Sequence, residues 1–193
     1  AGKPARLFPG AVFGEQPYEF TTNSEAFLDS TVHLASLKMD FELATGTLSS
    51  VTAYNETEAY YTQDGDASNL DLLYYGLNEL QKDFSQELIF SSRKQGRFSA
   101  VGGLFYYRAD GRYDPLDVLG AFAGPVPIHV WSKQVTDAYA VFGELTYELT
   151  ERLSVVGGAR YSDEKRTAYG TFQFGAGPLG TMVGLYEAAI DAL

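Results

Sequence analysis

The sequence predicts an all-β protein, an antiparallel meander of at least six strands. Three observations indicate this class: aromatic residues are abundant, apolar and polar residues alternate along several segments, and short connections alternate with long ones. Aromatic residues make up 15% of the 193 residues, with 14 Tyr and 13 Phe, and residues of this kind are enriched in strands. Nothing in the composition demands more than one folded unit, so we treat residues 1–193 as a single unit.

Alternation of apolar and polar residues defines the expected strands. Residues 37–43 are representative, because every second residue is apolar and the residues between them are charged. Successive side chains of a strand point to opposite faces, so this pattern is typical of a sheet with one apolar and one charged face. In residues 97–108 apolar residues occupy both alternating positions, and the facing of that strand stays open. By these patterns the six strands comprise residues 31–43, 47–62, 82–91, 97–108, 136–149 and 153–166.

The expected connections alternate in length. Connections of two to four residues, at 45–46, 93–96 and 150–152, alternate with long ones at 63–81 and 109–135. An antiparallel meander then has its tight turns at one rim and its long loops at the other, as outer-membrane barrels do. Soluble sandwiches have turn signals every ~8–12 residues without this asymmetry. The sequence therefore favours part of a large transmembrane β-barrel; the alternative is a soluble β-sandwich or lipocalin-like ligand-binding module with a dry core.

Charged residues opposite the apolar positions support the barrel. Charges that face a dry core are costly, whereas a water-filled or plugged barrel interior accommodates them. We therefore expect the apolar side to face lipid and the charged side to face the interior. The charged residues in question are Lys38, Asp40, Glu42, Glu87, Glu144, Glu148 and Arg160.

Other classes of protein fit the sequence poorly. The 14 basic residues are scattered and the net charge is −11, which argues against a nucleic-acid partner, because phosphate binding needs clustered Lys and Arg. No Cys is present, so disulfides and thiolate chemistry are excluded. The apolar stretches at 119–131 and 174–186 are shorter than the ~20 residues of a transmembrane helix. Residues 1–10 lack the continuous apolar stretch of a signal peptide.

Several segments, taken in order, resemble one protein family. They are Ser49–Tyr54 (SSVTAY), Asp83–Leu88 (DFSQEL), Gly102–Tyr107 (GGLFYY), Tyr139–Ser154 (YAVFGELTYELTERLS) and Gly157–Lys165 (GGARYSDEK). Over roughly residues 15–166 the chain resembles the mid-barrel region of TonB-dependent outer-membrane receptors. The ordered set carries the resemblance, because each string alone is weak.

The resemblance implies a receptor in the outer membrane of a Gram-negative bacterium. It would take up a scarce nutrient, such as a ferric siderophore, cobalamin or an oligosaccharide, by active transport that depends on TonB. The implied partners are outer-membrane lipid, the imported small molecule, TonB and a plug domain, and no cofactor is implied. The plug domain is expected to be absent from this chain. Residues 187–193 depart from the family pattern, and we interpret them as a truncation or a helical piece of a loop.

Aromatic and arginine residues near strand ends are the candidates for ligand binding. An aromatic ring can stack on a ligand, and a guanidinium can hold an anionic one. The alternative is that the rings pack at the membrane interface or in loops, and that the arginines pair with neighbouring acids. The candidates are Tyr74, Tyr75, Tyr107, Arg108, Tyr113, Trp131 and Arg160.

Two kinds of chemical site receive weaker support. Asp64, Asp66 and Asp71 place carboxylates in one loop and form a candidate calcium site, although the glycine and terminal glutamate of a calcium loop are not in their usual places. The alternative is a solvated turn. The two His residues, His33 and His129, have no accompanying hydrolase motif. We therefore expect no enzymatic activity.

Overall fold

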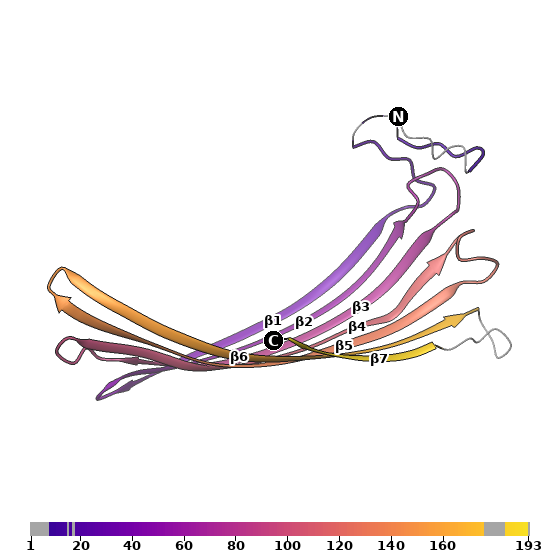
Figure 1. Cartoon of the computed structure of the whole chain (residues 1–193). Helices are drawn as coiled ribbons and strands as arrows, with labels where there is room; N and C mark the ends of the chain where they lie inside the picture. Colours follow the sequence, from indigo (N-terminus) through magenta and orange to yellow (C-terminus); the bar gives the residue numbers. More distant parts are fainter. Residues whose placement is uncertain (1–7, 15, 17, 176–183, 193) are drawn as a thin grey trace.

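The computed structural model describes residues 8–14, 16, 18–175 and 184–192, which form one seven-stranded antiparallel sheet. Each strand pairs with its neighbours in sequence, so the sheet is a meander (Figure 1). This confirms the predicted fold class. No helix in the described residues is long and apolar enough to cross a membrane. The strands are β1 (Phe27–Leu43), β2 (Gly46–Asp64), β3 (Tyr74–Ser92), β4 (Phe98–Leu119), β5 (Ile128–Thr150), β6 (Leu153–Phe174) and β7 (Gly184–Ala192).

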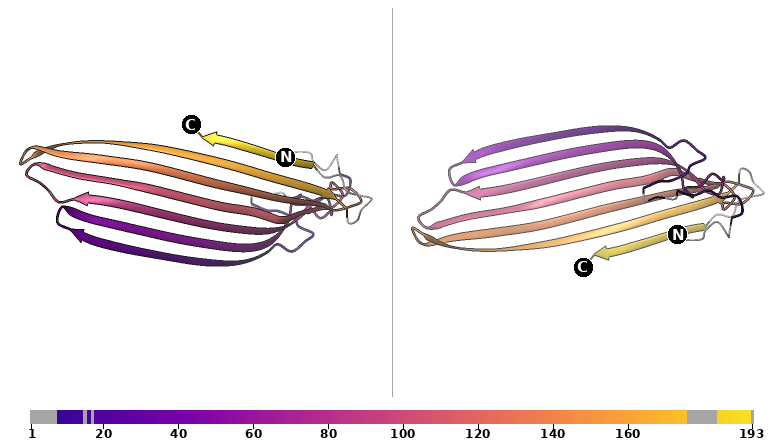
Figure 2. Two further views of the ribbon diagram at one scale, coloured as in Figure 1. Left: turned by 90° about the horizontal axis from the view of Figure 1, so that it is seen from below. Right: turned by 90° about the horizontal axis from the view of Figure 1, so that it is seen from above.

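The sheet is a single, strongly curved layer, with its strands side by side in sequence order (Figure 2). A soluble sandwich buries apolar side chains between two packed sheets. Among the described residues only Leu77 and Ala140 are buried apolar residues, whereas Leu104 is 56% exposed and Leu145 is 63% exposed. The alternative of a soluble module with a dry core is therefore wrong.

The six expected strands are present, but they extend further toward the long loops than the sequence pattern predicts. β3 begins at Tyr74 and β5 at Ile128, and β4 continues to Leu119. The predicted loops 63–81 and 109–135 consequently shrink to residues 65–73 and 120–127. The pattern failed there because polar residues interrupt the alternation. Backbone pairing does not depend on it and continues between β4 and β5 as far as Val118 and Ile128.

The helical interpretation of the C-terminal end is wrong for residues 187–192. These residues belong to β7, which pairs with β6 in a register that runs from Phe172 opposite Gly184 to Glu164 opposite Ala192. Alanine and glutamate favour helix in isolation. The edge of β6 presents unpaired backbone donors and acceptors, and a strand satisfies them where a helix would not. Residue 193 lies outside the described part.

The strand register separates the side chains into two faces. We call them the belt face and the polar face, each defined by one row across β1–β6. On the belt face the row is Met39, Ser50, Leu88, Leu104, Val141 and Tyr161. On the polar face the row is Lys38, Val51, Glu87, Phe105, Ala140 and Ser162.

The register also decides the facing of the strand that the sequence left open. In β4, Leu104 pairs with Leu88 and Val141, and so lies on the belt face. Phe105 pairs with Glu87 and therefore lies on the polar face. The two sets of apolar residues in β4 thus meet different environments.

Aromatic side chains bound the belt face at two levels. Toward the long loops, the rings of Tyr106 and Tyr139 are 5.0 Å apart, and toward the tight turns those of Phe98 and Tyr147 are 4.6 Å apart. Tyr139 and Tyr147 lie eight residues apart on β5, which corresponds to roughly 26 Å along a strand. With a barrel tilt of about 40° the height is near 20 Å, close to the ~25 Å apolar band of outer-membrane barrels.

Candidate functional site

The long-loop end of the sheet carries one connected cluster of loops, formed by residues 8–14, 16, 18–26, 65–73 and 120–127. The first two loops are joined by a hydrogen bond from the Val12 amide to Asn69 Oδ1 (2.6 Å). The last two are joined by a hydrogen bond from the Phe122 amide to the Leu72 carbonyl (2.9 Å). The segment before β1 therefore packs on the loops of the long-loop rim (Figure 1).

In the candidate calcium loop, the carboxylates of Asp64 and Asp66 accept hydrogen bonds from backbone amides. Asp64 Oδ1 accepts hydrogen bonds from the amides of Asp66 (3.0 Å) and Ala67 (2.9 Å), and Oδ2 accepts one from Asn23 (3.2 Å). Partial burial by itself would raise the pKa of Asp64, but these amide donors outweigh it and hold the pKa below its ordinary value. Asp64 therefore closes the turn.

Asp66 has a similar structural role. Its Oδ2 accepts hydrogen bonds from the amides of Leu72 (3.2 Å) and Leu73 (2.8 Å), while Asp71 contributes its backbone carbonyl to Ala121. In the described residues no three Asp, Glu or His side chains gather in a metal-binding group. We therefore do not carry the calcium site into the functional proposal.

The register divides the seven candidate ligand-binding residues between the two faces. Tyr75, Tyr107, Tyr113 and Arg160 lie on the polar face, and Tyr74, Arg108 and Trp131 lie on the belt face. On the belt face Arg108 Nη1 pairs with Asp137 Oδ1 at 3.1 Å, and Trp131 lies 5.9 Å from the ring of His129. Residues of the belt face do not point into the interior that the polar face lines. These three therefore leave the candidate site.

Arg160 and Tyr107 form part of one cluster on the polar face. The guanidinium carbon of Arg160 lies 5.9 Å from the ring centroid of Phe105 and 5.8 Å from that of Phe142, within the range of cation–π attraction. The ring of Phe105 lies nearly parallel to that of Tyr107, at 6.5 Å. Arginine and aromatic side chains from three neighbouring strands thus meet on one surface.

A hydrogen-bond network holds the Tyr107 side of this cluster. Asp83 accepts hydrogen bonds from the Tyr107 hydroxyl (3.0 Å), Asn55 Nδ2 (3.1 Å) and Gln81 Nε2 (3.0 Å). Charge-assisted bonds of this kind are stronger than neutral ones. The orientation of the Tyr107 ring is therefore fixed by Asp83 of β3, which is itself held by Asn55 of β2.

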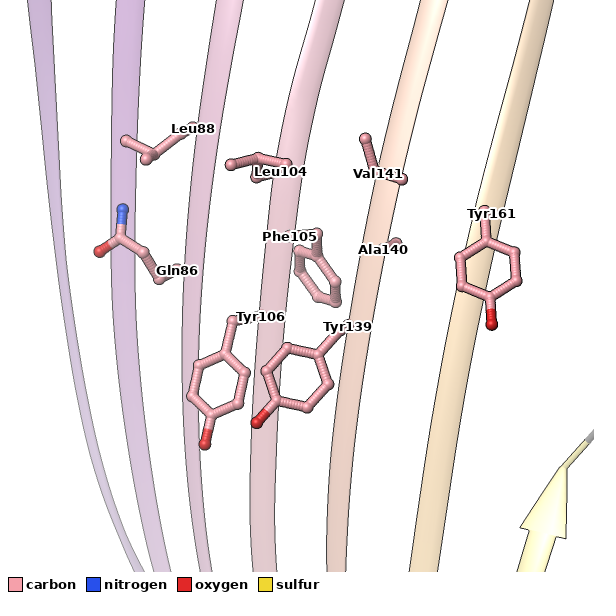
Figure 3. A pocket seen from close by; sticks show the side chains of 9 residues that line it. All are labelled: Gln86, Leu88, Leu104, Phe105, Tyr106, Tyr139, Ala140, Val141 and Tyr161. Carbon is pink, nitrogen blue, oxygen red and sulfur yellow. The ribbon is translucent and has the colours of Figure 1, made fainter.

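Both faces are hollowed at this level, but the hollows differ in character. The hollow on the polar face has a volume of about 350 Å³ and is lined by Phe105, Tyr107, Arg160, Ser162 and Glu164, among others. The hollow on the belt face has a volume of about 400 Å³ (Figure 3). Apart from Gln86 its walls are apolar and aromatic, with Tyr106, Tyr139 and Tyr161 side by side on neighbouring strands. Of these two hollows, only the one on the polar face offers charged groups to a ligand.

Sequence reasoning missed Phe142, Phe105 and Asp83 as parts of the site. A signal for Phe142 was present, because it shares the alternating position of Glu144 and Thr146 and is an aromatic residue among polar ones. Asp83 gave no such signal. Its partners come from three strands, and their proximity depends on register.

An exposed apolar belt between two aromatic levels, opposite a charged face in a single curved sheet, defines a segment of the wall of a transmembrane β-barrel. The family model described as "TonB dependent receptor-like, beta-barrel" matches residues 3–182. The chain therefore belongs to that family.

One solved structure similar to this chain is the ferric yersiniabactin uptake receptor FyuA from Yersinia pestis, with a TM-score of 0.70 at 15% sequence identity. The likeness covers 86% of this chain and 25% of FyuA, so the chain spans about a quarter of that receptor. At this identity the likeness shows the fold. The comparison with curated proteins finds no match.

Proposed function

We propose that this chain supplies barrel wall and outer loops to an outer-membrane receptor of a Gram-negative bacterium. The receptor imports a scarce nutrient such as a ferric siderophore, cobalamin or an oligosaccharide, with energy delivered through TonB. The belt face carries this proposal. Its exposed leucines would be unfavourable in water but suit the lipid between two aromatic levels.

Two further features support an uptake receptor. The long loops gather at one rim, where a ligand would arrive from outside the cell. The polar face combines charge with aromatic rings, which are groups that bind polar ligands. The similar structure FyuA is an uptake receptor for a ferric siderophore, so ferric siderophores are the first ligand class to test. We propose no catalytic activity.

Uptake by intact cells tests the proposal. The gene that encodes this wall would be deleted, and uptake of 55Fe presented as a panel of ferric siderophores would be compared in cells with and without TonB. We expect the deletion to abolish uptake of one siderophore, and restoration of the gene to rescue it only in cells that have TonB. The same panel with radiolabelled cobalamin and oligosaccharides covers the other ligand classes.

Fractionation of the same cells supplies the second readout. We expect the protein in the outer membrane, extractable only with detergent. Recovery in the soluble fraction, or uptake of all three ligand classes that is indifferent to the deletion, contradicts the proposal.

A further inference from the structure

The environment of Arg160 on the polar face differs from that of two other strand cations there. Lys38 pairs with Asp40 at 3.2 Å, and Arg166 pairs with Glu164. Within the described part of the chain, Arg160 has no carboxylate oxygen within 4.0 Å and so forms no ion pair. Its charge is thus uncompensated by a direct carboxylate partner on this stretch of wall.

The local structure nevertheless holds the guanidinium in place. Arg160 Nε donates to Ser162 Oγ at 3.0 Å, and the rings of Phe105 and Phe142 lie close to the guanidinium carbon. The Phe142 ring in turn lies against Gly103, where an added Cβ would come within 2.5 Å of Phe142 Cζ. The side chain is oriented by packing, while its two terminal nitrogens, Nη1 and Nη2, have no partner in the described residues.

A planar anion is the ligand that fits this arrangement. Two terminal N–H groups of a guanidinium match the two oxygens of a carboxylate in a bidentate pair, and aromatic contacts reduce the entropy lost when the pair forms. The neighbouring hollow of about 350 Å³ has room for a small aromatic or aliphatic carboxylate. Arginine is also less strongly hydrated than lysine, which lowers the cost of pairing inside a barrel.

We propose that Arg160 is an anion-binding residue of the barrel interior and binds a carboxylate end-on through Nη1 and Nη2. The proposal rests on the proposed function, which places the polar face inside a barrel. The carboxylate belongs either to an imported ligand or to another part of the receptor, and the two arms of the test distinguish these sources.

The first arm uses phenylglyoxal, which modifies accessible arginines, on the whole receptor in detergent. Modification of Arg160 and of Arg166 is followed by mass spectrometry with and without benzoate, and benzyl alcohol serves as the uncharged probe. At a benzoate concentration about four times its dissociation constant we expect modification of Arg160 to slow about fivefold by mass action. Benzyl alcohol should leave the rate unchanged. Arg166, which is already paired, should respond to neither probe.

The second arm uses the Arg160→Lys variant with a carbodiimide, which joins an amine to a carboxylate that contacts it. A cross-link from this lysine to an acid outside the barrel wall would locate the carboxylate elsewhere in the receptor. Arg166→Lys is the matched positive control, because the new amine should cross-link to Glu164.

Protection by benzoate or a cross-link outside the wall supports the proposal. Two results overturn it. One is a modification rate of Arg160 that benzoate does not change, together with a Lys variant that forms no cross-link. The other is a cross-link to Glu87, Glu144, Glu164 or an acid of any other barrel strand, which would show an ordinary ion pair within the wall. Neither arm requires transport, so failure of uptake and failure of this site are separate results.

Discussion

At the scale of single residues, Gly103 sets the position of an aromatic ring. It pairs with Phe142 across β4 and β5, and a Cβ at this position would lie 2.5 Å from Phe142 Cζ and 2.7 Å from the Leu88 carbonyl oxygen. A glycine covered by an aromatic residue on the neighbouring strand is a stabilising combination in sheets. The cation–π contact between Arg160 and Phe142 therefore depends on the absence of a side chain at Gly103, two strands away.

Substitution of Gly103 by Ala tests this dependence. The new methyl group must displace the Phe142 ring and also crowds the Leu88 carbonyl oxygen, and we expect a loss of about 1–3 kcal/mol in the free energy of unfolding, the usual cost of overpacking. Urea unfolding of the receptor in phospholipid vesicles would measure it. Gly111→Ala on the same strand is the control, because nothing lies within 4 Å of its added Cβ. Equal losses at both positions would refute the role of the ring.

The lowered pKa of Asp64 leads to a prediction of how the loop cluster responds to pH. Its pKa is lowered, so the carboxylate stabilises the fold above the ordinary value of 3.8, and this contribution is lost as the pH falls below 3.8 through the folded-state pKa. We expect amide exchange at Asp66 and Ala67, corrected for the intrinsic rate, to stay slow at pH 5 and to quicken only below pH 3.8.

The Asp64→Ala variant tests the same role of the carboxylate at neutral pH. Removal of the acceptor should cost about 1 kcal/mol of local opening free energy, which is roughly a fivefold loss of amide protection at pH 7. Hydrogen-exchange mass spectrometry of the receptor measures both effects. Unchanged protection in this variant would show that other contacts close the turn.

At the scale of elements, β4 has apolar side chains on both the belt face and the polar face. Leu104 is exposed on the belt face between Leu88 and Val141, while Val101 lies on the polar face. Both are aliphatic, and they are three residues apart in the sequence. Their environments differ because an odd separation along a strand reverses the side-chain direction.

This difference predicts opposite tolerance to charge. Leu104→Arg introduces a cation on the lipid side, two residues from Tyr106 and inside the belt, where we expect a loss of about 1–3 kcal/mol, between the interface and midplane values of outer-membrane barrels. Val101→Arg points the same group into the polar interior, and we expect a much smaller loss. Urea titration of both variants in phospholipid vesicles compares them directly. A Val101→Arg variant that is the less stable of the two would reverse the assignment of the faces.

At the scale of the whole molecule, the described sheet is open and covered on neither face. β1 has a free edge, and the belt face exposes large apolar side chains from β1 to β6. Unpaired edges and wide apolar patches both promote association in water. A closed barrel in lipid removes both liabilities.

We therefore expect the 193-residue chain, expressed alone, to aggregate or self-associate in aqueous buffer. Detergent should suppress this association by covering the belt face, and the remaining strands of a barrel should suppress it by pairing the edges. Size-exclusion chromatography with light scattering distinguishes the outcomes. A stable, monodisperse monomer in plain buffer would mean that the sheet closes on itself.

The sequence was sufficient for the fold class, the two-faced strands and the alternation of tight turns with long loops. Each depends on local rules, since side chains alternate with a period of two and turn residues act over a few positions. The same rules were misleading at the strand ends above the belt, where Asp110 and Arg112 suggested a loop. There, Lys133 from β5 pairs with Asp110 at 2.7 Å and the sheet continues.

Register across strands was decided only by the tertiary structure. It placed Phe105, Phe142 and Arg160 together, brought Asn55 and Tyr107 to Asp83, and moved Arg108 and Trp131 to the opposite face. A shift of one residue would exchange every side chain between lipid and interior. Such pairing joins residues far apart in the chain, and for that reason alternation along one strand could indicate two faces but not which residues of different strands meet.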